Sequence, residues 1–510
     1  MSTIRSSTLT GFRGLDERLI YGSDPTKTTS LDNVIVRNGV VSGRKGIALW
    51  DGISSAATNI ITGLAEFYAP ATATSTLLRI HRTKLEKWTD STNSWDDITG
   101  TALTGADTDR PCFATMSDEG FVVFTNEGHD RPRKYTGTGN SAVLGGTPPF
   151  AKWLWPYVGF LFLFNTSTDG TFGAIADSIT CYFSDIPDGD WALCEGNTII
   201  FDESPGELRA AMTFGDGLVV FKSDCLVLLR FVGGITRFNR RKLAFSHGIL
   251  APLSLQQIGD QGLIFLATDR NLYRTDGNQV VALPPAVQKS LQETMTPAVA
   301  ANCRGYVDIS HETYHLLYQR NSTTYFDGRL SVNYRTGEFY RAAYTGYEFT
   351  AALGYRTTNN VNAQLVVAAN DKKVYEQETG TDDAATTVSR IYDVDWTQFG
   401  VDGEKWLTGT EMTFIRNRDL RVRVSVAVDK SSKFIHRKVY SLRGTDPDET
   451  EVRIDYKPPH PVFGTWFKIR IEMFHDAATN VCELKSIGPE IIPIHAATET
   501  SKRREAPLSA

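Results

Sequence analysis

A hairpin unit recurs along this chain and restricts the folds open to it. Residues 259–277 read GDQGLIFLATDRNLYRTDG: an apolar run, a polar turn that contains Asp269, and a second short run that stops at Asp276. Residues 215–231 (GDGLVVFKSDCLVLLRF) and 362–380 (NAQLVVAANDKKVYEQETG) follow the same order. Apolar runs of about four to eight residues bounded by Gly, Asp, Asn and Thr are typical of strands. The unit is therefore interpreted as a β-hairpin and its aspartates as turn residues that bond their own backbone.

Seven such hairpins can be followed, and their spacing indicates a propeller. Their first strands begin 36–61 residues apart, near Leu77, Phe121, Tyr157, Leu218, Leu263, Tyr314 and Leu365. A four-stranded propeller blade takes about 40–50 residues. The predicted fold class is mainly β, an irregular β-propeller of about 6–7 blades with a C-terminal antiparallel β-sandwich; a pair of sandwiches is the alternative. Leu263, Phe265, Leu218 and Val220 are expected to point into cores between blades.

Changes in the pattern divide the chain into four parts. They are an extended N-terminal segment with a β-hairpin (1–50), the propeller (51–400), a β-sandwich domain (401–495) and a flexible tail (496–510). The hairpin in the first part is signalled by Asn38-Gly39, because both positions of a tight two-residue turn need a positive φ. The best helix candidate, 284–301, begins at a proline and has Pro297 as its expected end. In the third part, RVRVSVAVD alternates strictly, as in a strand with one buried face.

Composition excludes several classes of function. The 510 residues carry a net charge of −6, and the pI is about 5.9. Clustered cations that neutralise phosphates are needed for a general nucleic-acid-binding surface, so this balance argues against one. The N-terminus lacks an apolar stretch of signal-peptide length, and the longest apolar run, 153–164, is too short for a membrane span and is expected to form a buried strand pair. The six cysteines form no CxxC pair and indicate reduced core residues instead of a zinc site.

No motif of known chemistry appears, so we predict no catalytic, cofactor-binding or metal-ligating residue and expect a protein that is not an enzyme. The sequence has no GxxxxGK[ST], GxSxG or HExxH pattern. His311 and His315 have helical ligand spacing, but the stretch is interpreted as a strand, which would place them about 13 Å apart.

Two groups of carboxylates were weighed for glycan cleavage, which needs a pair about 5–9 Å apart. Asp393 and Asp395 lie on one face of the expected strand YDVDW. The stretch SDIPDGDW, with Asp185, Asp188 and Asp190, distantly resembles the Asp-box turn of sialidases, but its Asp and Gly are displaced and the Thr is missing. Turn aspartates are the simpler interpretation of both groups.

Three stretches resemble a family of phage tail proteins. LDNVIVRNGVVSGRKGIALW (31–50) is similar to an N-terminal signature in which a strand hairpin is followed by a basic–Gly step, here Arg44-Lys45-Gly46, into the first blade. FTNEGHDRPRKYTG (124–137) is similar to a recurring TNG…PxKYDG hairpin, and FLFNTSTDG followed by CYFSDIPDGDW to an NTS…WSD..DP..W blade. The chain departs from the pattern at Asp130-Arg131 and Asp188-Gly189, where Pro-rich turns are more usual. The family is that of the tail nozzle (hub) proteins of short-tailed bacteriophages.

The resemblance implies a structural virion protein in the phage tail, assembled in the host cytoplasm. It implies a β-propeller protomer in a homo-oligomeric ring, commonly a hexamer, below the portal and the adaptor. Such a ring forms the distal channel through which DNA passes without specific binding, and it anchors tail fibres or spikes. The resemblance implies no catalytic residue and no cofactor. The alternative function is a carbohydrate-binding or glycan-cleaving, receptor-interacting propeller of the tail.

An acidic lumen would let DNA slide, because it repels phosphates. Two acidic loops are the best candidates for lining such a channel. Their residues are Asp382, Asp383, Asp446, Asp448, Glu449 and Glu451.

Overall fold

The computed structural model describes most of the chain as two compact units. The described residues are 4–5, 8–19, 24–50, 56–70, 73–184, 197–234, 237–243, 246–284, 287–320, 324–356, 362–384, 386–415, 420–442, 450–475 and 482–493. Arg44–Val388 form one unit, the propeller unit. Met1–Gly43 and Ser389–Ala510 together form the other, the sandwich unit. The predicted flexible tail, 496–510, lies outside the described residues.

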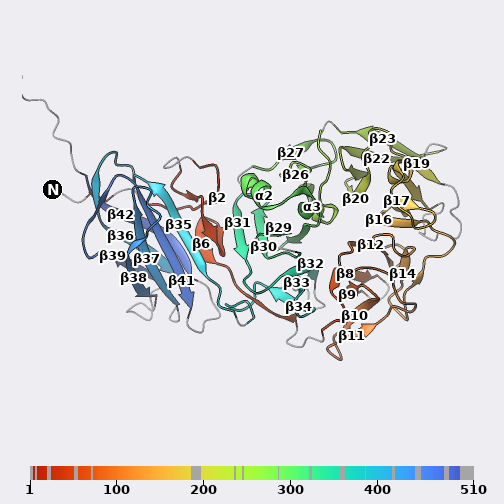
Figure 1. Cartoon of the computed structure of the whole chain (residues 1–510), viewed down its shortest axis with the longest axis horizontal. Helices are drawn as coiled ribbons and strands as arrows, with labels where there is room; N and C mark the ends of the chain where they lie inside the picture. The colour runs from red at the N-terminus through yellow and green to blue at the C-terminus, as the bar shows by residue number, and fades with distance from the viewer. Residues whose placement is uncertain are drawn as a thin grey trace, which may run out of the picture. The chain divides into compact units, whose positions relative to one another are not determined.

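The propeller unit contains seven four-stranded antiparallel sheets arranged as blades around an axis (Figure 1). Blade 1 consists of β8 (Ile61–Ala69), β9 (Thr74–His81), β10 (Lys84–Thr89) and β11 (Ser94–Asp97). Blade 2 consists of β12 (Pro111–Met116), β13 (Phe121–Asn126), β14 (Arg133–Tyr135) and β15 (Ala142–Val143). Blade 3 consists of β16 (Phe150–Tyr157), β17 (Phe160–Ser167), β18 (Thr180–Phe183) and β19 (Thr198–Ile200). Blade 4 consists of β20 (Leu208–Phe214), β21 (Gly217–Lys222), β22 (Leu226–Gly233) and β23 (Arg237–Lys242). Blade 5 consists of β24 (Gln256–Gln257), β25 (Leu263–Leu266), β26 (Leu272–Thr275) and β27 (Val280–Ala282). Blade 6 consists of β28 (Arg304–Asp308), β29 (Thr313–Tyr318), β30 (Gly328–Asn333) and β31 (Phe339–Ala343). Blade 7 consists of β32 (Phe349–Arg356), β33 (Asn362–Ala368), β34 (Lys373–Gln377) and β7 (Ile47–Leu49).

The predicted propeller is confirmed, with seven blades, and the recurring hairpin is the middle of each blade. Its two strands are the second and third from the axis, as β25 and β26 show for the stretch 259–277. The innermost strand of each blade, such as β8 or β12, precedes the hairpin in sequence. The first apolar run of the repeat is buried along its whole length in β13, β17, β21, β25 and β29, because a neighbouring blade covers each of its faces.

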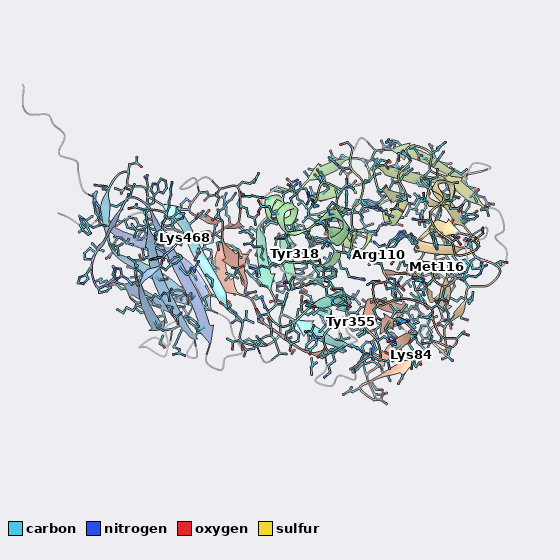
Figure 2. All side chains as sticks on the ribbon, viewed as in Figure 1. Lys84, Arg110, Met116, Tyr318, Tyr355 and Lys468 are labelled. Atoms are coloured by element: carbon cyan, nitrogen blue, oxygen red, sulfur yellow. The ribbon has the colours of Figure 1, made fainter. Side chains whose placement is uncertain are left out.

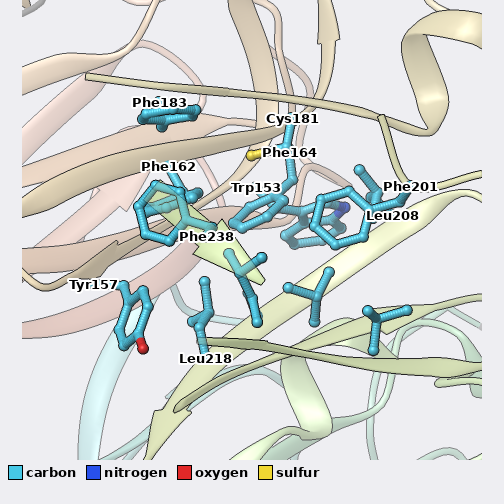
Figure 3. Close-up of a cluster of buried hydrophobic side chains, with 14 of the residues drawn as sticks. Trp153, Tyr157, Phe162, Phe164, Cys181, Phe183, Phe201, Leu208, Leu218 and Phe238 are labelled. Atoms are coloured by element: carbon cyan, nitrogen blue, oxygen red, sulfur yellow. The ribbon is translucent and has the colours of Figure 1, made fainter. Parts of the chain in front are cut away.

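Apolar side chains fill the space between neighbouring blades. Leu218 and Val220 lie in the core between blades 3 and 4, and Leu263 and Phe265 in the core between blades 4 and 5, as expected. The core between blades 3 and 4 is rich in aromatic rings and includes Phe162, Phe183 and Phe238 (Figure 3). Phe162 is fully buried, and its ring centroid lies 5.2 Å from that of Phe238. These interfaces give the propeller its hydrophobic core.

The ring is closed by a strand from the beginning of the chain. β7 pairs with β34 in blade 7, with Leu49 opposite Tyr375 and Ile47 opposite Gln377. The basic–Gly step that precedes β7 was expected to lead into the first blade, whereas β7 belongs to the last one. Gly46 is needed there because a Cβ at this position would lie 1.8 Å from the Asp382 carbonyl oxygen. The two chain segments that enter and leave the propeller therefore touch through their backbones.

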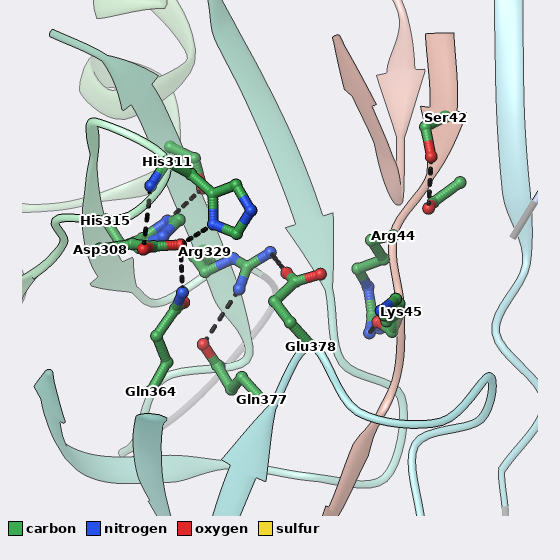
Figure 4. Close-up of polar contacts among 12 residues, drawn as sticks. Ser42, Arg44, Lys45, Asp308, His311, His315, Arg329, Gln364, Gln377 and Glu378 are labelled. Atoms are coloured by element: carbon green, nitrogen blue, oxygen red, sulfur yellow. Dashed lines mark hydrogen bonds and ion pairs between the residues drawn. The ribbon is translucent and has the colours of Figure 1, made fainter. Parts of the chain in front are cut away.

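Polar side chains surround this closure (Figure 4). Arg44 forms a buried bidentate pair with Asp383, with Nη1–Oδ1 and Nη2–Oδ2 distances of 2.7 and 2.5 Å. Arg44 also donates to the Ala343 carbonyl oxygen of blade 6. Arg329, which is fully buried on β30, donates to Gln377 and to Glu378 at the end of β34. The network links blade 6, blade 7 and the two segments that connect the propeller to the rest of the chain.

The sandwich unit consists of two antiparallel sheets and a short parallel pair, β2 (Gly14–Leu15) with β3 (Lys27–Thr28). The larger sheet contains β39 (Glu451–Tyr456), β36 (Lys405–Ile415), β42 (Glu483–Pro493), β6 (Val40–Gly43), β5 (Val34–Arg37), β1 (Ile4–Arg5) and β40 (Val462–Gly464). The other contains β38 (Ile435–Ser441), β37 (Leu420–Val428), β41 (Phe467–His475), β35 (Arg390–Thr397) and β4 (Leu31–Asp32). The predicted hairpin is β5–β6, and Asn38 and Gly39 have φ values of 52° and 76°.

The N-terminal segment is therefore part of the sandwich unit and not a separate region. β6 pairs with β42 through Val41 and Leu484, and β4 pairs with β35. The sandwich unit resumes at Ser389 instead of 401, because β35 pairs with β41. The propeller unit is thus inserted between two segments of the sandwich unit. Periodicity could not reveal this arrangement, since it does not say which strands pair.

Helices are few and short. The expected helix at 284–301 is described as α2 (Gln288–Thr294) and α3 (Pro297–Ala300), with Pro297 opening the second helix. α1 (Ile175–Ser178) follows β17, and a 3-10 turn, η3 (Pro252–Ser254), precedes β24. Among the described residues, no helix has the length and apolar character to cross a membrane.

Candidate functional site

The axis of the propeller contains a cavity of about 180 Å³. Every blade contributes to its wall through its innermost strand or the residues just before that strand. The apolar lining includes Leu64, Leu154, Leu253 and Leu353. A water molecule occupies about 30 Å³ in the liquid, so this space holds roughly six waters. It is far too narrow for nucleic acid, and any DNA channel would have to lie outside the propeller axis.

Arg304 is the one cationic residue in the wall of the axial cavity. It is the first residue of β28, and it also lines a second pocket of about 50 Å³ that it shares with Asp107, Asp109 and Arg110. Arg110 lies toward the middle of the propeller in Figure 2. Arg304 is the single residue that lines both spaces, so it lies where the apolar cavity meets the polar pocket.

The charge of Arg304 has no direct counter-ion in the part of the chain that the structure describes. Its Nε is buried without a hydrogen-bond partner. Burial and the nearby Arg110 guanidinium lower the pKa of Arg304 to about 10, so the group is still charged at neutral pH. The nearest carboxylate that acts on it, Glu127, is bound to Arg110 through both the side chain and the backbone N–H of that residue.

The other polar groups of these two spaces differ in their bonding. Asp107 lines the smaller pocket, and its Oδ1 is buried without a hydrogen-bond partner among the described residues. Asp109 accepts from the backbone N–H of Ala106 at 2.8 Å and lies 3.1 Å from His129 Nε2. The thiol of Cys112, in the wall of the axial cavity, contacts the Leu154 carbonyl oxygen at 3.5 Å. Burial raises the pKa of that thiol to about 11, so it remains neutral. The axial cavity is therefore a space of mixed apolar and polar surface, and Arg304 is the one cation among the described residues that line it.

The predicted acidic loops have different environments. Asp383 is buried in its pair with Arg44, so its carboxylate is not free to line a channel. Asp382 is partly buried, and its backbone carbonyl accepts from Ile47. Glu451 is on β39 and pairs with the exposed Lys485. Asp446, Asp448 and Glu449 lie outside the described residues.

The carboxylates weighed for glycan cleavage also differ from expectation. Asp393 is fully buried, and its two oxygens accept from Arg470 Nε and Nη2 at 2.7 and 2.8 Å. Lys468 Nζ lies 3.3 Å from Asp393 and 3.9 Å from Asp395. Because Asp393 is buried and both of its oxygens are bonded to Arg470, this carboxylate is not open to a sugar. Asp185, Asp188 and Asp190 lie outside the described residues.

The remaining candidates have local roles. Asp269 accepts from the Asn271 N–H and the Tyr273 hydroxyl, and Asp276 accepts from the N–H groups of Asn278 and Gln279. Both are turn residues, as predicted from the opening hairpin. His311 and His315 bond separate partners, Asp308 and Ser331. Within the described ranges, no group of three or more His, Cys, Asp or Glu side chains could hold a metal ion.

Sequence reasoning missed Arg304. The signal available was its position: it opens the innermost strand of a blade directly after the expected helix. The corresponding innermost strands of other blades place Gly, Pro, Ala and Leu at the cavity wall. A comparison of the seven blades with one another, position by position, would have singled out the arginine.

Comparison with known proteins gives little beyond the fold. No protein-family model matches the sequence, and neither does any curated protein. Among solved structures, the β-propeller domain of Myceliophteria thermophila Cps50 (Swd1) aligns with 65% of this chain and 99% of its own, at 9% identity and a TM-score of 0.42. Apo AztD from Citrobacter koseri aligns with 62% of this chain and 86% of its own, at 12% identity and a TM-score of 0.36.

BBS1N in complex with ARL6DN aligns with 66% of this chain and 96% of its own, at 10% identity and a TM-score of 0.39. All three likenesses cover about the length of the propeller unit. At these identities and scores they carry no statement about function. The propeller assignment rests on the strand pairing described above.

The bidentate pair of Asp393 and Arg470 gives a testable expectation. Replacing Asp393 with Asn keeps the shape but removes the charge that compensates Arg470 and Lys468, so we expect Asp393→Asn to lower the free energy of unfolding by about 2–3 kcal/mol. Asp455→Asn, in the exposed pair with Lys457 of the same unit, should cost less than about 1 kcal/mol. Urea unfolding measures both. A stable Asp393→Asn protein that loses glycan cleavage would contradict the structural role assigned to Asp393.

Proposed function

We propose that this chain is a structural subunit of the tail of a short-tailed bacteriophage, a nozzle or hub protein that assembles into a ring. One observation carries the proposal: the stretch 31–50, which resembles the nozzle signature most fully, supplies strands to both units. It contributes β4, β5 and β6 to the sandwich unit and β7 to the propeller. A segment that supplies strands to two folded units suits a protein with an architectural role.

A second stretch that resembles the family also has an architectural role. FTNEGHDRPRKYTG forms the β13–β14 hairpin of blade 2. Asp130, at which the chain departs from the family pattern, accepts from the backbone N–H of Thr104 at 2.8 Å and from Asn126 Nδ2 at 2.7 Å. The departure thus replaces a Pro-rich turn with a hydrogen-bonded one, which ties the hairpin to the loop before the blade.

In this proposal DNA passes through a lumen between subunits, since the propeller axis is closed to it. The net charge of −6 supports a conduit that does not retain phosphates. The proposal assigns no catalytic residue. Asp393 gives no support to the glycan-cleaving alternative, because both of its oxygens are bonded to Arg470.

The test is the assembly state of the purified full-length chain. Analytical ultracentrifugation and negative-stain electron microscopy should reveal a closed ring, and we expect six copies. Immunogold labelling of phage particles should locate the protein at the distal end of the tail. A chain that stays monomeric at high concentration and is absent from mature particles would refute the proposal.

A further inference from the structure

The axial cavity and Arg304 together have the form of a ligand site. In the described part of the chain, the Arg304 side chain makes no hydrogen bond and no ion pair, and its Nε is buried. Arg304 is partly buried, and a guanidinium held partly out of water without a carboxylate costs free energy unless some group compensates it. Arg110 adds a second positive charge nearby, and Glu127 is already bonded to Arg110. Asp107 lines the smaller pocket but forms no ion pair with Arg304. An anion in the axial cavity would supply the partner that Arg304 lacks.

The space beside Arg304 restricts the kind of anion. The cavity measures about 180 Å³. Apolar side chains, among them Leu154, Leu253 and Leu353, line it together with a substantial share of polar atoms. An apolar cavity of about 150 Å³ is large enough to bind benzene. A fully hydrated ion makes no favourable contact with apolar side chains. An apolar group that fits the cavity displaces water that is poorly hydrogen-bonded there. The indole N–H of Trp155, which also lines the space, is already bonded to Thr213 and requires no ligand.

We propose that the propeller axis binds a small organic monocarboxylate with a compact apolar body. Its carboxylate accepts from the Arg304 guanidinium at the edge of the cavity, and its apolar body fills the space among the leucines. A planar guanidinium presents paired N–H donors whose geometry matches a carboxylate. The proposal does not depend on ring assembly, since all the residues involved belong to one propeller unit.

Isothermal titration calorimetry on the full-length chain tests the proposal, with sodium benzoate as the probe. Benzamide is the neutral probe of the same shape, and inorganic phosphate is the anion without an apolar body. Arg304→Met removes the cation, and Ala352→Leu narrows the cavity while it leaves Arg304 in place. Arg335→Met is the control, because Arg335 is an exposed arginine of the same unit and lines neither space.

Benzoate should bind the unmodified chain with a Kd on the order of 1 mM, as suits so small a ligand. We expect Arg304→Met to weaken binding by about 10- to 100-fold, since a hydrogen bond to a charged group is lost. Benzamide should bind at least about tenfold more weakly than benzoate, and so should benzoate to Ala352→Leu. Arg335→Met should bind benzoate as the unmodified chain does.

Three results would overturn the proposal. They are no heat of binding with benzoate, equal binding to Arg304→Met, and phosphate binding as tight as benzoate, which would leave a simple anion site. Circular dichroism confirms that each variant is folded. If Arg304→Met does not fold, two measurements that keep Arg304 still test the proposal. They are the comparison of benzoate with benzamide and the binding of benzoate to Ala352→Leu.

Discussion

Asp383→Asn is expected to destabilise the propeller unit by about 3–5 kcal/mol, the largest effect of a single substitution that we foresee. The side chains of Arg44 and Asp383 are 1% and 3% exposed, and they form two hydrogen bonds with each other. Asparagine can accept only one of these bonds and carries no charge, so the guanidinium would stay buried without compensation. The midpoint of urea unfolding, followed by tryptophan fluorescence, measures the loss.

A double variant separates the pair from its surroundings. Arg44→Met combined with Asp383→Leu removes both charges, and its loss should be smaller than that of Asp383→Asn alone. The exposed pair of Arg335 and Glu312 in the same unit provides the control, because Glu312→Gln should cost less than about 1 kcal/mol. An Asp383→Asn midpoint equal to that of the unmodified chain would show that the pair does not hold the closure.

Phe162→Ala should have an effect of similar size, a loss of about 3–5 kcal/mol. Phe162 is fully buried between blades 3 and 4, and its ring lies against those of Phe164, Phe183 and Phe238. Alanine would leave a cavity that the rigid strands around it cannot fill. The expected sign is a lower unfolding midpoint, measured by thermal melting and by urea unfolding.

Phe231→Ala is the matched control for this prediction. Phe231 belongs to the same aromatic group, with ring contacts to Phe160 and Phe238, but 43% of its surface is exposed. Its replacement should cost about 1 kcal/mol, because nearly half of its surface is already in water. Equal losses for the two variants would contradict the assignment of the buried aromatic core to the interface between blades.

The sequence predicted the blades because their signal is local and repeated. Blades 2 to 6 each contain an apolar run that is buried on both faces, such as LIFL at Leu263–Leu266, and in several blades an aspartate such as Asp269 holds the turn. Repetition allowed seven weak signals to support one another. The same reasoning placed the β5–β6 hairpin, since Asn38-Gly39 specifies its turn without reference to the rest of the chain.

What the sequence did not reveal depends on pairing between distant residues. Ile47 lies opposite Gln377, and Val41 lies opposite Leu484. The local sequence pattern of each strand does not indicate which distant strand it pairs with. Asp383 was chosen for its acidic loop, but its role is set by Arg44, far away in sequence. Arg304 was overlooked because its candidate role depends on the absence of a hydrogen-bond partner among the described residues, and no local sequence pattern indicates such an absence.

The insertion of the propeller unit within the sandwich unit has a consequence for synthesis. The strands up to Gly43 leave the ribosome first, but their partners β35 and β42 follow only after residue 388. β7 likewise cannot pair until β34 has been synthesised. At about 5–20 residues per second, the nascent N-terminus spends tens of seconds with unpaired apolar strands. During that interval the growing chain needs protection from aggregation, so the yield of this protein should depend on chaperone supply more than on its final stability.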